Sequence, residues 1–252
     1  MYKILEKKIA IITGGTKGLG FIISKELASL GAELIIIYKS DDKNAYRNLK
    51  KIKKLSPKSK IYKLDINSKN DLNDFYKNEI GSKKIDILIN NAGINKRQFM
   101  NEITEEDWDM VFNTNLKSLF FFTRKLWPNL KRAKYSKIIN ISSVAGQYHG
   151  PKTIHYSVSK AALNSLTKIL ARYGAKDKIL VNAIAPGIFK TEQTLSEFKT
   201  QDAQKIIRET TLLGVPGKEN DLSSLVRALI DPNQQYLTGQ IISLSGGAII
   251  QN

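Results

Sequence analysis

A tyrosine and a lysine four positions apart are the residues of this chain best suited to proton transfer. Tyr156 and Lys160 fall within a segment of helical pattern, 154–173, so their side chains project from the same face. A phenol with a pKa of ~10 is a poor acid–base catalyst at neutral pH, but a neighbouring ammonium group favours the phenolate and lowers that pKa. We therefore expect Tyr156 to donate or accept a proton.

A serine thirteen residues before this tyrosine completes the set. Ser143 comes at the end of an expected strand, where its hydroxyl could hydrogen-bond a carbonyl oxygen that is gaining negative charge. A donor fixed in place stabilises the transition state more than the ground state. Each residue alone also has a structural explanation, because serines at strand ends often bond turns and Tyr/Lys pairs often lie on helix surfaces. A nucleotide-binding motif elsewhere in the chain favours the catalytic interpretation.

That motif is TGGTKGLG at 13–20, between an apolar run at 9–12 and a helix-like segment. A glycine-rich turn in this position lets the backbone approach a pyrophosphate, whose charge the helix N-terminus stabilises. The glycines could also merely build a tight turn. Combined with the tyrosine, lysine and serine, the motif predicts that the chain binds a dinucleotide.

The elements that must position these residues alternate along the chain. Short β-branched runs predict strands at 8–12, 33–38, 60–66, 85–90, 137–142, 179–185 and 240–244; helical patterns cover 18–30, 45–55, 68–80, 104–131, 154–173 and, less regularly, 195–229. Such alternation is typical of parallel βαβ units, and several strands are apolar on both faces. We expect one α/β domain over 1–252, a doubly wound, Rossmann-type parallel sheet of about seven strands with helices on both faces.

Right-handed crossovers bring the carboxyl ends of parallel strands to one edge of a sheet. The sequence NNAG at 90–93 closes the fourth expected strand, Ser142 and Ser143 close the fifth, and Pro186 and Gly187 follow the sixth. Together with the glycine-rich turn, these residues should meet in one crevice.

Composition excludes several other chemistries. The chain has no cysteine and only two histidines, which excludes disulfides and thiolate nucleophiles and argues against a metal site. The apolar run near the N-terminus is too short for a signal peptide or a membrane span. We expect a soluble, cytoplasmic protein without a metal and without a membrane partner.

The net charge of +17 could indicate nucleic acid, anionic lipid or an acidic protein as a partner. Only seven of the 40 basic residues are arginine, whereas base readout and phosphate clamping favour arginine. The bias toward lysine favours a solvated surface, with an acidic protein partner as the second interpretation and no nucleic acid expected.

The motifs together resemble the short-chain dehydrogenase/reductase family, in its single-domain branch. The resemblance covers residues 8–247 and rests on TGGTKGLG, NNAG, Asn115, Ser143, YSVSK at 156–160, APG at 185–187 and Thr191. It implies hydride exchange between the C4 atom of a nicotinamide and a carbonyl or alcohol carbon, with Tyr156 handling the proton.

The resemblance also implies residue roles. Lys160 would hold the nicotinamide ribose while tuning Tyr156, Ser143 would position the substrate oxygen, and Asn115 would hold a water of the proton relay. Asp65 would contact the adenine and Thr191 the carboxamide. The catalytic set is Asn115, Ser143, Tyr156 and Lys160. The cofactor contacts expected are Gly14, Thr16, Lys17, Gly18, Leu19, Gly20, Tyr38, Lys39, Ser40, Asp65, Ile66, Asn91, Ala92, Gly93, Tyr156, Lys160, Pro186, Gly187, Ile188 and Thr191.

The end of the second strand indicates which nicotinamide cofactor is used. An acidic residue there bonds the ribose 2′-hydroxyl, whereas a basic residue accommodates a 2′-phosphate. Here the sequence is Tyr38, Lys39, Ser40, followed by Asp41 and Asp42. We expect NADP(H), with NAD(H) as the alternative if Asp41 takes the acidic role.

Within the family the chain looks most like 3-oxoacyl-(acyl carrier protein) reductases. Acyl carrier proteins are acidic, and a set of basic residues could steer one toward the site. That set is Arg124, Lys131, Arg132, Lys134, Lys176 and Lys178.

Sugar-acid and polyol dehydrogenases of the same family are the alternative. Segments 94–100 and 147–155 resemble theirs, and Lys96, Arg97, His149 and His155 are plausible substrate contacts beside Ser143 and Tyr156. Residues 189–213 would form a lid over the substrate. A non-catalytic nucleotide-sensing or nucleic-acid-binding module is a further alternative, against which the intact Ser143, Tyr156 and Lys160 set argues.

Assembly is indicated by apolar stripes longer than one core needs. They include Phe120, Phe121, Phe122 and Trp127 in the helical segment 104–131. In the family this segment and 154–173 pair across a two-fold axis, and the last strand makes a second contact. The resemblance therefore implies a homotetramer.

Overall fold

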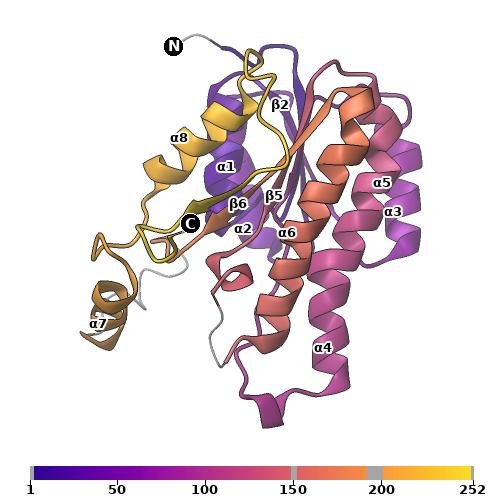
Figure 1. Ribbon diagram of the computed structural model, residues 1–252. Helices are drawn as coiled ribbons and strands as arrows, with labels where there is room; N and C mark the ends of the chain where they lie inside the picture. Colours follow the sequence, from indigo (N-terminus) through magenta and orange to yellow (C-terminus); the bar gives the residue numbers. More distant parts are fainter. Residues whose placement is uncertain (1–2, 149–151, 192–200, 251–252) are drawn as a thin grey trace.

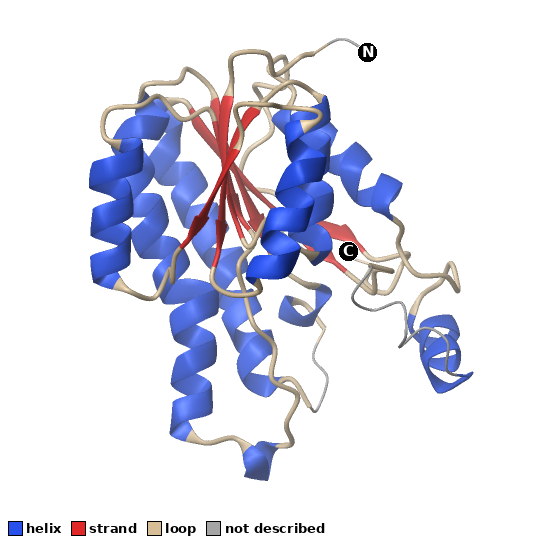
Figure 2. Ribbon diagram, turned by 180° about the vertical axis from the view of Figure 1, so that it is seen from behind, coloured by secondary structure: helices blue, strands red, loops and turns tan. Residues whose placement is uncertain are grey.

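The protein is described by a computed structural model that covers residues 3–148, 152–191 and 201–250. Its centre is a seven-stranded sheet in the order β3-β2-β1-β4-β5-β6-β7, in which every neighbouring pair is parallel (Figures 1 and 2). The strands are β1 (Ile9–Thr13), β2 (Glu33–Tyr38), β3 (Lys60–Lys63), β4 (Ile87–Asn90), β5 (Ser136–Ile141), β6 (Ile179–Pro186) and β7 (Ile241–Leu244). The doubly wound fold expected from the sequence is confirmed.

Helices cover both faces of the sheet (Figure 1). On one face lie α1 (Gly18–Ser29), α2 (Asp42–Lys53) and α8 (Glu219–Ile230), and on the other lie α3 (Lys69–Phe75), α5 (Ser118–Lys131) and α6 (Ile154–Gly174). The central strands are buried along their whole length, as every residue of β4, β5 and β6 shows. This two-sided burial explains why these strands are mostly apolar rather than alternating, with a few buried polar residues such as Asn90, Asn140 and Asn182.

The long helix expected at 104–131 is interrupted by one wide turn. It consists of α4 (Glu105–Phe112), a π-helical turn at Asn113–Lys117 and α5. Such a turn inserts an extra residue into the helical repeat and is frequent at functional sites. Its inward-facing residue is Asn115, whose side chain is fully buried.

The region expected to be irregular and to form a lid contains two helices, α7 (Gln201–Thr210) and α8. Figure 1 shows α7 standing away from the sheet, whereas α8 packs against α1. Residues 192–200, the middle of the expected lid, lie outside the described residues. The lid assignment stays a prediction.

The strand order reverses direction beside β1, since β2 follows it on one side and β4 lies on the other. At such a switch point the two crossovers leave the sheet on opposite faces, and a crevice opens beyond the carboxyl ends of the strands. The fold therefore provides a ligand site where the sequence motifs meet.

Candidate active site

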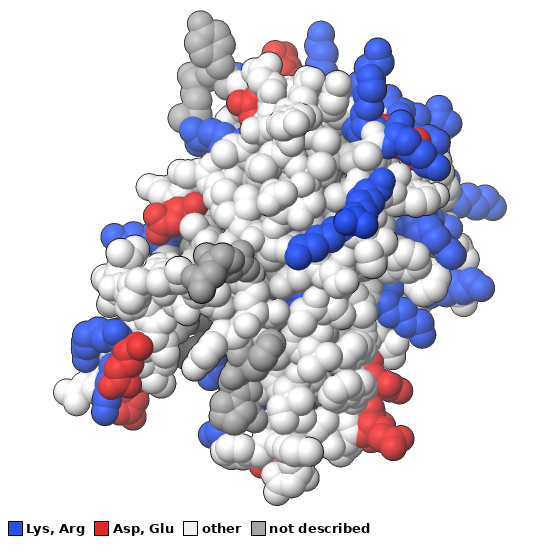
Figure 3. All heavy atoms as spheres, in the orientation of Figure 1, with Lys and Arg blue, Asp and Glu red and all other residues white. Residues whose placement is uncertain are grey.

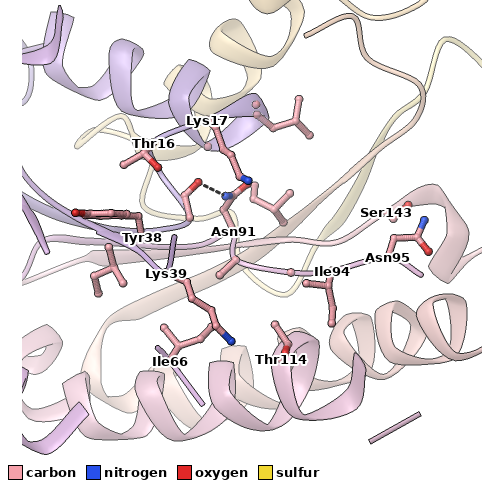
Figure 4. A pocket seen from close by; sticks show the side chains of 18 of the residues that line it. Thr16, Lys17, Tyr38, Lys39, Ile66, Asn91, Ile94, Asn95, Thr114 and Ser143 are labelled. Carbon is pink, nitrogen blue, oxygen red and sulfur yellow. Dashed lines mark hydrogen bonds between the residues drawn. The ribbon is translucent and has the colours of Figure 1, made fainter. Parts of the chain in front are cut away.

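A single pocket of about 680 Å³ runs along this edge of the sheet, from the glycine-rich turn to the start of α6 (Figure 4). Of the expected cofactor contacts, all line this pocket except Ile188 and Thr191. Ser143 also lines it, so the hydroxyls expected to be catalytic share one cavity with the glycine-rich turn. The convergence inferred from strand order is borne out.

The glycine-rich turn packs tightly on itself and on the segment after β4, which leaves no room for a side chain at Gly20. A Cβ atom at Gly20 would lie 2.2 Å from the Gly14 carbonyl oxygen and 2.5 Å from the side-chain nitrogen of Asn91. The Asn91 amide donates to the carbonyls of Thr13 and Gly14, at 3.0 and 2.9 Å, and Figure 4 shows this side chain beneath the turn. The NNAG segment therefore braces the glycine-rich turn.

The catalytic helix is tied to the π-helical turn by a buried asparagine and a buried serine. The Asn115 side chain accepts from the backbone amide of Ile94 at 2.8 Å, and donates to the Ile94 carbonyl and the Ser159 hydroxyl at 3.0 Å each. The Ser159 hydroxyl in turn donates to the Tyr156 carbonyl at 2.7 Å. Asn115 thus lies behind the pocket wall rather than in it, and it fixes the first turn of α6.

Lys160 is buried beside the tyrosine. Its Nζ donates to the Ile141 carbonyl at 2.8 Å and lies 5.7 Å from the centre of the Tyr156 ring. Burial lowers the pKa of the Lys160 ammonium to about 8. Removal of an ammonium from water disfavours its charged form.

The pKa of Tyr156 is raised by burial, and a hydrogen bond with Ser143 only partly opposes this effect. The expectation that the lysine lowers this pKa is therefore wrong for the protein on its own. The physical reason is that the ammonium bonds the Ile141 carbonyl and that burial penalises the phenolate. Tyr156 is consequently a protonated phenol at neutral pH.

Ser143 has both a structural and a site-facing role. Its hydroxyl accepts from the Ala145 amide at 3.1 Å, which caps the short 3-10 turn Val144–Gly146. A Cβ atom at Gly146 would lie 2.7 Å from the Lys160 backbone, so this turn packs directly on α6. That close packing brings the serine to the tyrosine.

Charged residues define the other end of the pocket. Lys39 Nζ lies 2.7 Å from Asp65 Oδ2. Burial alone raises the pKa of Asp65, but hydrogen bonds from Lys39 and the Asn67 amide leave it below its usual value. Asp41 and Asp42 do not line the pocket. Asp41 caps α2 by accepting from the Asn44 amide at 3.2 Å, and Asp42 pairs with Lys63 at 2.9 Å.

Two of the expected substrate contacts are elsewhere, and a third lies outside the described residues. Lys96 pairs with Asp107 at 2.6 Å and does not line the pocket. His155 is fully buried, and neither ring nitrogen has a hydrogen-bond partner in the described part of the chain. His149 lies outside the described residues.

Sequence reasoning missed several residues of the pocket wall, although it expected Ser142 in the crevice and the segment 94–100 near the substrate. Asn95, which belongs to that segment, lies near Ser143 in Figure 4. Others come from α4 and the π-helical turn, where the wide turn shifts which residues face the sheet. The additional lining residues are Ile37, Leu64, Asn67, Ile94, Asn95, Met110, Asn113, Thr114, Ile141 and Ser142.

The basic residues proposed to steer an acidic carrier lie mostly at the wrong end of the sheet. Helices α5 and α6 begin beside the pocket and end at the opposite edge, so Lys131, Lys176 and Lys178 lie near the start of β5 and β6. Lys131 also pairs with Asp177 at 3.0 Å. Figure 3 shows basic side chains gathered on this part of the surface. They do not surround the pocket mouth.

The short chain dehydrogenase family matches residues 8–202 of this chain. The chain is 32% identical over 251 residues to the 3-oxoacyl-(acyl-carrier-protein) reductase of Thermotoga maritima, which covers 98% of this chain and 99% of the relative. Pseudomonas aeruginosa RhlG, solved as an active-site complex with NADP, superposes with a TM-score of 0.89 at 28% identity over 98% of each chain. A candidate gluconate dehydrogenase from Agrobacterium tumefaciens superposes with a TM-score of 0.91 at 27% identity over 100% of each chain.

The chain belongs to the short-chain dehydrogenase/reductase family and is an oxidoreductase of that family. In the described ranges no helix is long and apolar enough to cross a membrane. The same ranges contain no group of three or more histidine or acidic side chains that could hold a metal ion.

Proposed function

We propose that the protein is an NADP(H)-dependent reductase that interconverts a ketone and a secondary alcohol, with a 3-oxoacyl thioester as the substrate class. One observation carries the proposal: Ser143, Tyr156 and Lys160 line the same pocket as the glycine-rich turn. A role in nucleotide sensing or nucleic-acid binding would not require this arrangement. Salt-sensitive RNA binding without ketone reduction would contradict the proposal.

The pocket fits a dinucleotide. The turn at Gly14, Gly18 and Gly20 would hold the pyrophosphate, because these glycines line the pocket and α1 begins there at Gly18. Lys160 would hold the nicotinamide ribose hydroxyls, and Ile188 and Thr191 would contact the carboxamide end. The bound nicotinamide supplies or accepts the hydride at its C4 atom.

The protein's own residues handle the proton. Tyr156 donates it to the substrate oxygen during reduction, while the Ser143 hydroxyl holds that oxygen where charge develops. Because burial raises its pKa, the phenol carries a proton at neutral pH, which favours the donor role and hence reduction. Asn115, expected to hold a relay water, would instead act by positioning α6, because its amide already donates to the Ile94 carbonyl and the Ser159 hydroxyl.

The preference for NADP(H) is supported by the residues at the end of β2. Lys17, Lys39 and Ser40 line the pocket, whereas Asp41 and Asp42 do not. A solved relative binds NADP in its active site. Fluorescence titration with NADPH and NADH tests this preference. We expect NADPH to bind more tightly, and tighter binding of NADH would contradict the proposed preference.

A thioester substrate is supported by the relative from Thermotoga maritima, which is named for such a substrate. Keto sugars and sugar acids are the second candidate, favoured by the similarity to the candidate gluconate dehydrogenase and by the polar Asn95 in the pocket wall. A reductase assay with NADPH across acetoacetyl thioesters, keto sugars and keto acids separates them. We expect the thioesters to give the highest kcat/KM; a higher value for a keto sugar would select the alternative.

We also propose a homotetramer. Large apolar side chains stay exposed on α4, α5 and α6 in the single chain, namely Trp108, Phe121, Val158, Ile169 and Tyr173. Burying such a surface between copies removes apolar area from water. Light scattering at micromolar concentration should give four times the chain mass, and a monomer would contradict the proposal. The cytoplasmic location stays a prediction.

A further inference from the structure

The ion pair between Lys39 and Asp65 joins two walls of the nucleotide pocket. Lys39 follows β2 and Asp65 follows β3, both side chains line the cavity, and their charged atoms are 2.7 Å apart. Figure 4 shows Lys39 pointing toward the side of the pocket where Ile66 and Thr114 lie. The side-chain amide of Asn67 donates to the Thr114 hydroxyl at 3.1 Å. This bond holds the turn after β3 against the π-helical turn.

This part of the pocket is where the adenosine of a dinucleotide must lie. The pyrophosphate rests on the turn between β1 and α1, and the adenosine ribose extends from there to the end of β2. The base would then lie beyond the ribose, near the lining residues Ile66 and Thr114. Lys39 and Asp65 line the same part of the pocket, so their ion pair lies where the adenosine would bind.

We infer that Lys39 selects the cofactor twice: paired with Asp65 it obstructs adenine nucleotides that lack a 2′-phosphate, and released from Asp65 it binds the phosphate of those that have one. This inference rests on the proposed NADP(H) preference. A nucleotide with a 2′-phosphate gives the displaced ammonium a new anionic partner. A nucleotide with a 2′-hydroxyl breaks the same pair and offers no anion in return.

The exposure of the two side chains makes such an exchange feasible. The Lys39 side chain is 67% exposed and that of Asp65 is 31% exposed. Ion pairs this exposed are weak, so one can be broken by an incoming ligand at modest cost. A buried pair would instead lock the pocket, because removing one partner from a buried pair leaves an unpaired charge.

The test measures binding of 5′-AMP and 2′,5′-ADP by isothermal titration calorimetry to the wild type, Lys39→Met and Lys63→Met. Lys63 is the matched control, since it carries the same charge, pairs with Asp42 at 2.9 Å in the same region and does not line the pocket. Both substitutions remove one positive charge near the site. Only the first removes the obstruction.

We expect Lys39→Met to bind 5′-AMP about two- to fivefold more tightly than Lys63→Met does, the range that a weak exposed ion pair allows. The same variant should bind 2′,5′-ADP at least about tenfold more weakly, because it loses a charge-assisted contact. If Lys39→Met binds 5′-AMP no better than Lys63→Met, the pair is not an obstruction and the inference is overturned.

Failure of the proposed cofactor preference has a different signature. In that case the wild type itself would bind 2′,5′-ADP no more tightly than 5′-AMP. The 5′-AMP comparison between Lys39→Met and Lys63→Met would still report whether the ion pair obstructs the adenosine site. The two outcomes are therefore separable within one set of titrations.

Discussion

The two ends of the pocket are built in opposite ways. The catalytic end is defined by Asn115, Ser143, Tyr156, Ser159 and Lys160. Three of these residues, Asn115, Ser159 and Lys160, are at most 4% exposed and donate hydrogen bonds to backbone carbonyls. At the adenosine end, defined by Lys39 and Asp65, the contact is an ion pair at the surface.

The difference follows from what each end must do. Proton transfer requires groups held in one geometry before the substrate arrives, and burial with full hydrogen bonding provides this. Discrimination between two cofactors requires contacts that exchange when a ligand binds, and exposed ion pairs exchange at little cost. The contrast predicts that mutation, pH and salt act differently at the two ends.

The largest effect is expected from Tyr156→Phe. Loss of the phenolic hydroxyl removes the proton donor while the ring and the cofactor contacts remain, so kcat should fall by about 10²–10⁴-fold. NADPH affinity, measured by fluorescence titration, should stay nearly unchanged. Steady-state rates near those of the wild type would show that Tyr156 is not the proton donor.

Titration of Lys160 should be visible in the pH dependence of reduction. Its pKa of about 8 means that the ammonium is present below pH 8 and is lost above it, while Tyr156, whose pKa is raised, keeps its proton. We expect kcat for reduction to fall about tenfold between pH 7 and pH 9, as one deprotonation requires. A rate that is constant over this range would show that the lysine charge is not needed.

Ser159→Ala tests whether the hydrogen bonds behind the pocket position the catalytic helix. One lost hydrogen bond of about 1 kcal/mol should lower kcat roughly five- to tenfold and leave KM nearly unchanged. The control is Ser157→Ala, because Ser157 is similarly buried on the same helix and its hydroxyl lies 3.0 Å from that of Thr153, away from Asn115. Equal losses in both variants would indicate only a general effect on the helix.

The smallest effect is expected from salt. Raising NaCl from about 50 to 500 mM should weaken 2′,5′-ADP binding by a few fold, because surface charges are screened. Under saturating cofactor and substrate, kcat should change little, since the catalytic groups are shielded from solvent. If kcat falls in parallel with nucleotide affinity, the two ends of the pocket do not differ in their sensitivity to salt.

The sequence was sufficient where function depends on local spacing. The separation of Tyr156 and Lys160 by four residues and the glycines of 13–20 determine their own geometry, and the alternation of strands and helices determined the fold. Of the four residues expected to be catalytic, Ser143, Tyr156 and Lys160 line the pocket, as the sequence predicted, and Asn115 does not.

The remaining features depend on contacts between distant segments. Lys96 was expected to face a substrate, but a carboxylate eleven residues later, Asp107, holds it. The lowered pKa of the tyrosine was expected from its lysine neighbour, but the carbonyl of Ile141 binds that ammonium instead. Neither partner is evident from local spacing, because each is brought there by tertiary packing.

The wide turn between α4 and α5 has a consequence for how this chain can tolerate deletions. A π-helical turn holds one more residue than the α-helical turn it replaces, so removing one residue from 113–117 would restore regular winding and leave α4 and α5 in phase with each other. Phe122 and Leu126 would then keep their places against the sheet, whereas the side-chain amide of Asn115 would lose its place beside Ile94 and Ser159. Such a deletion would therefore detach α6 from this turn without loosening α5 from the core.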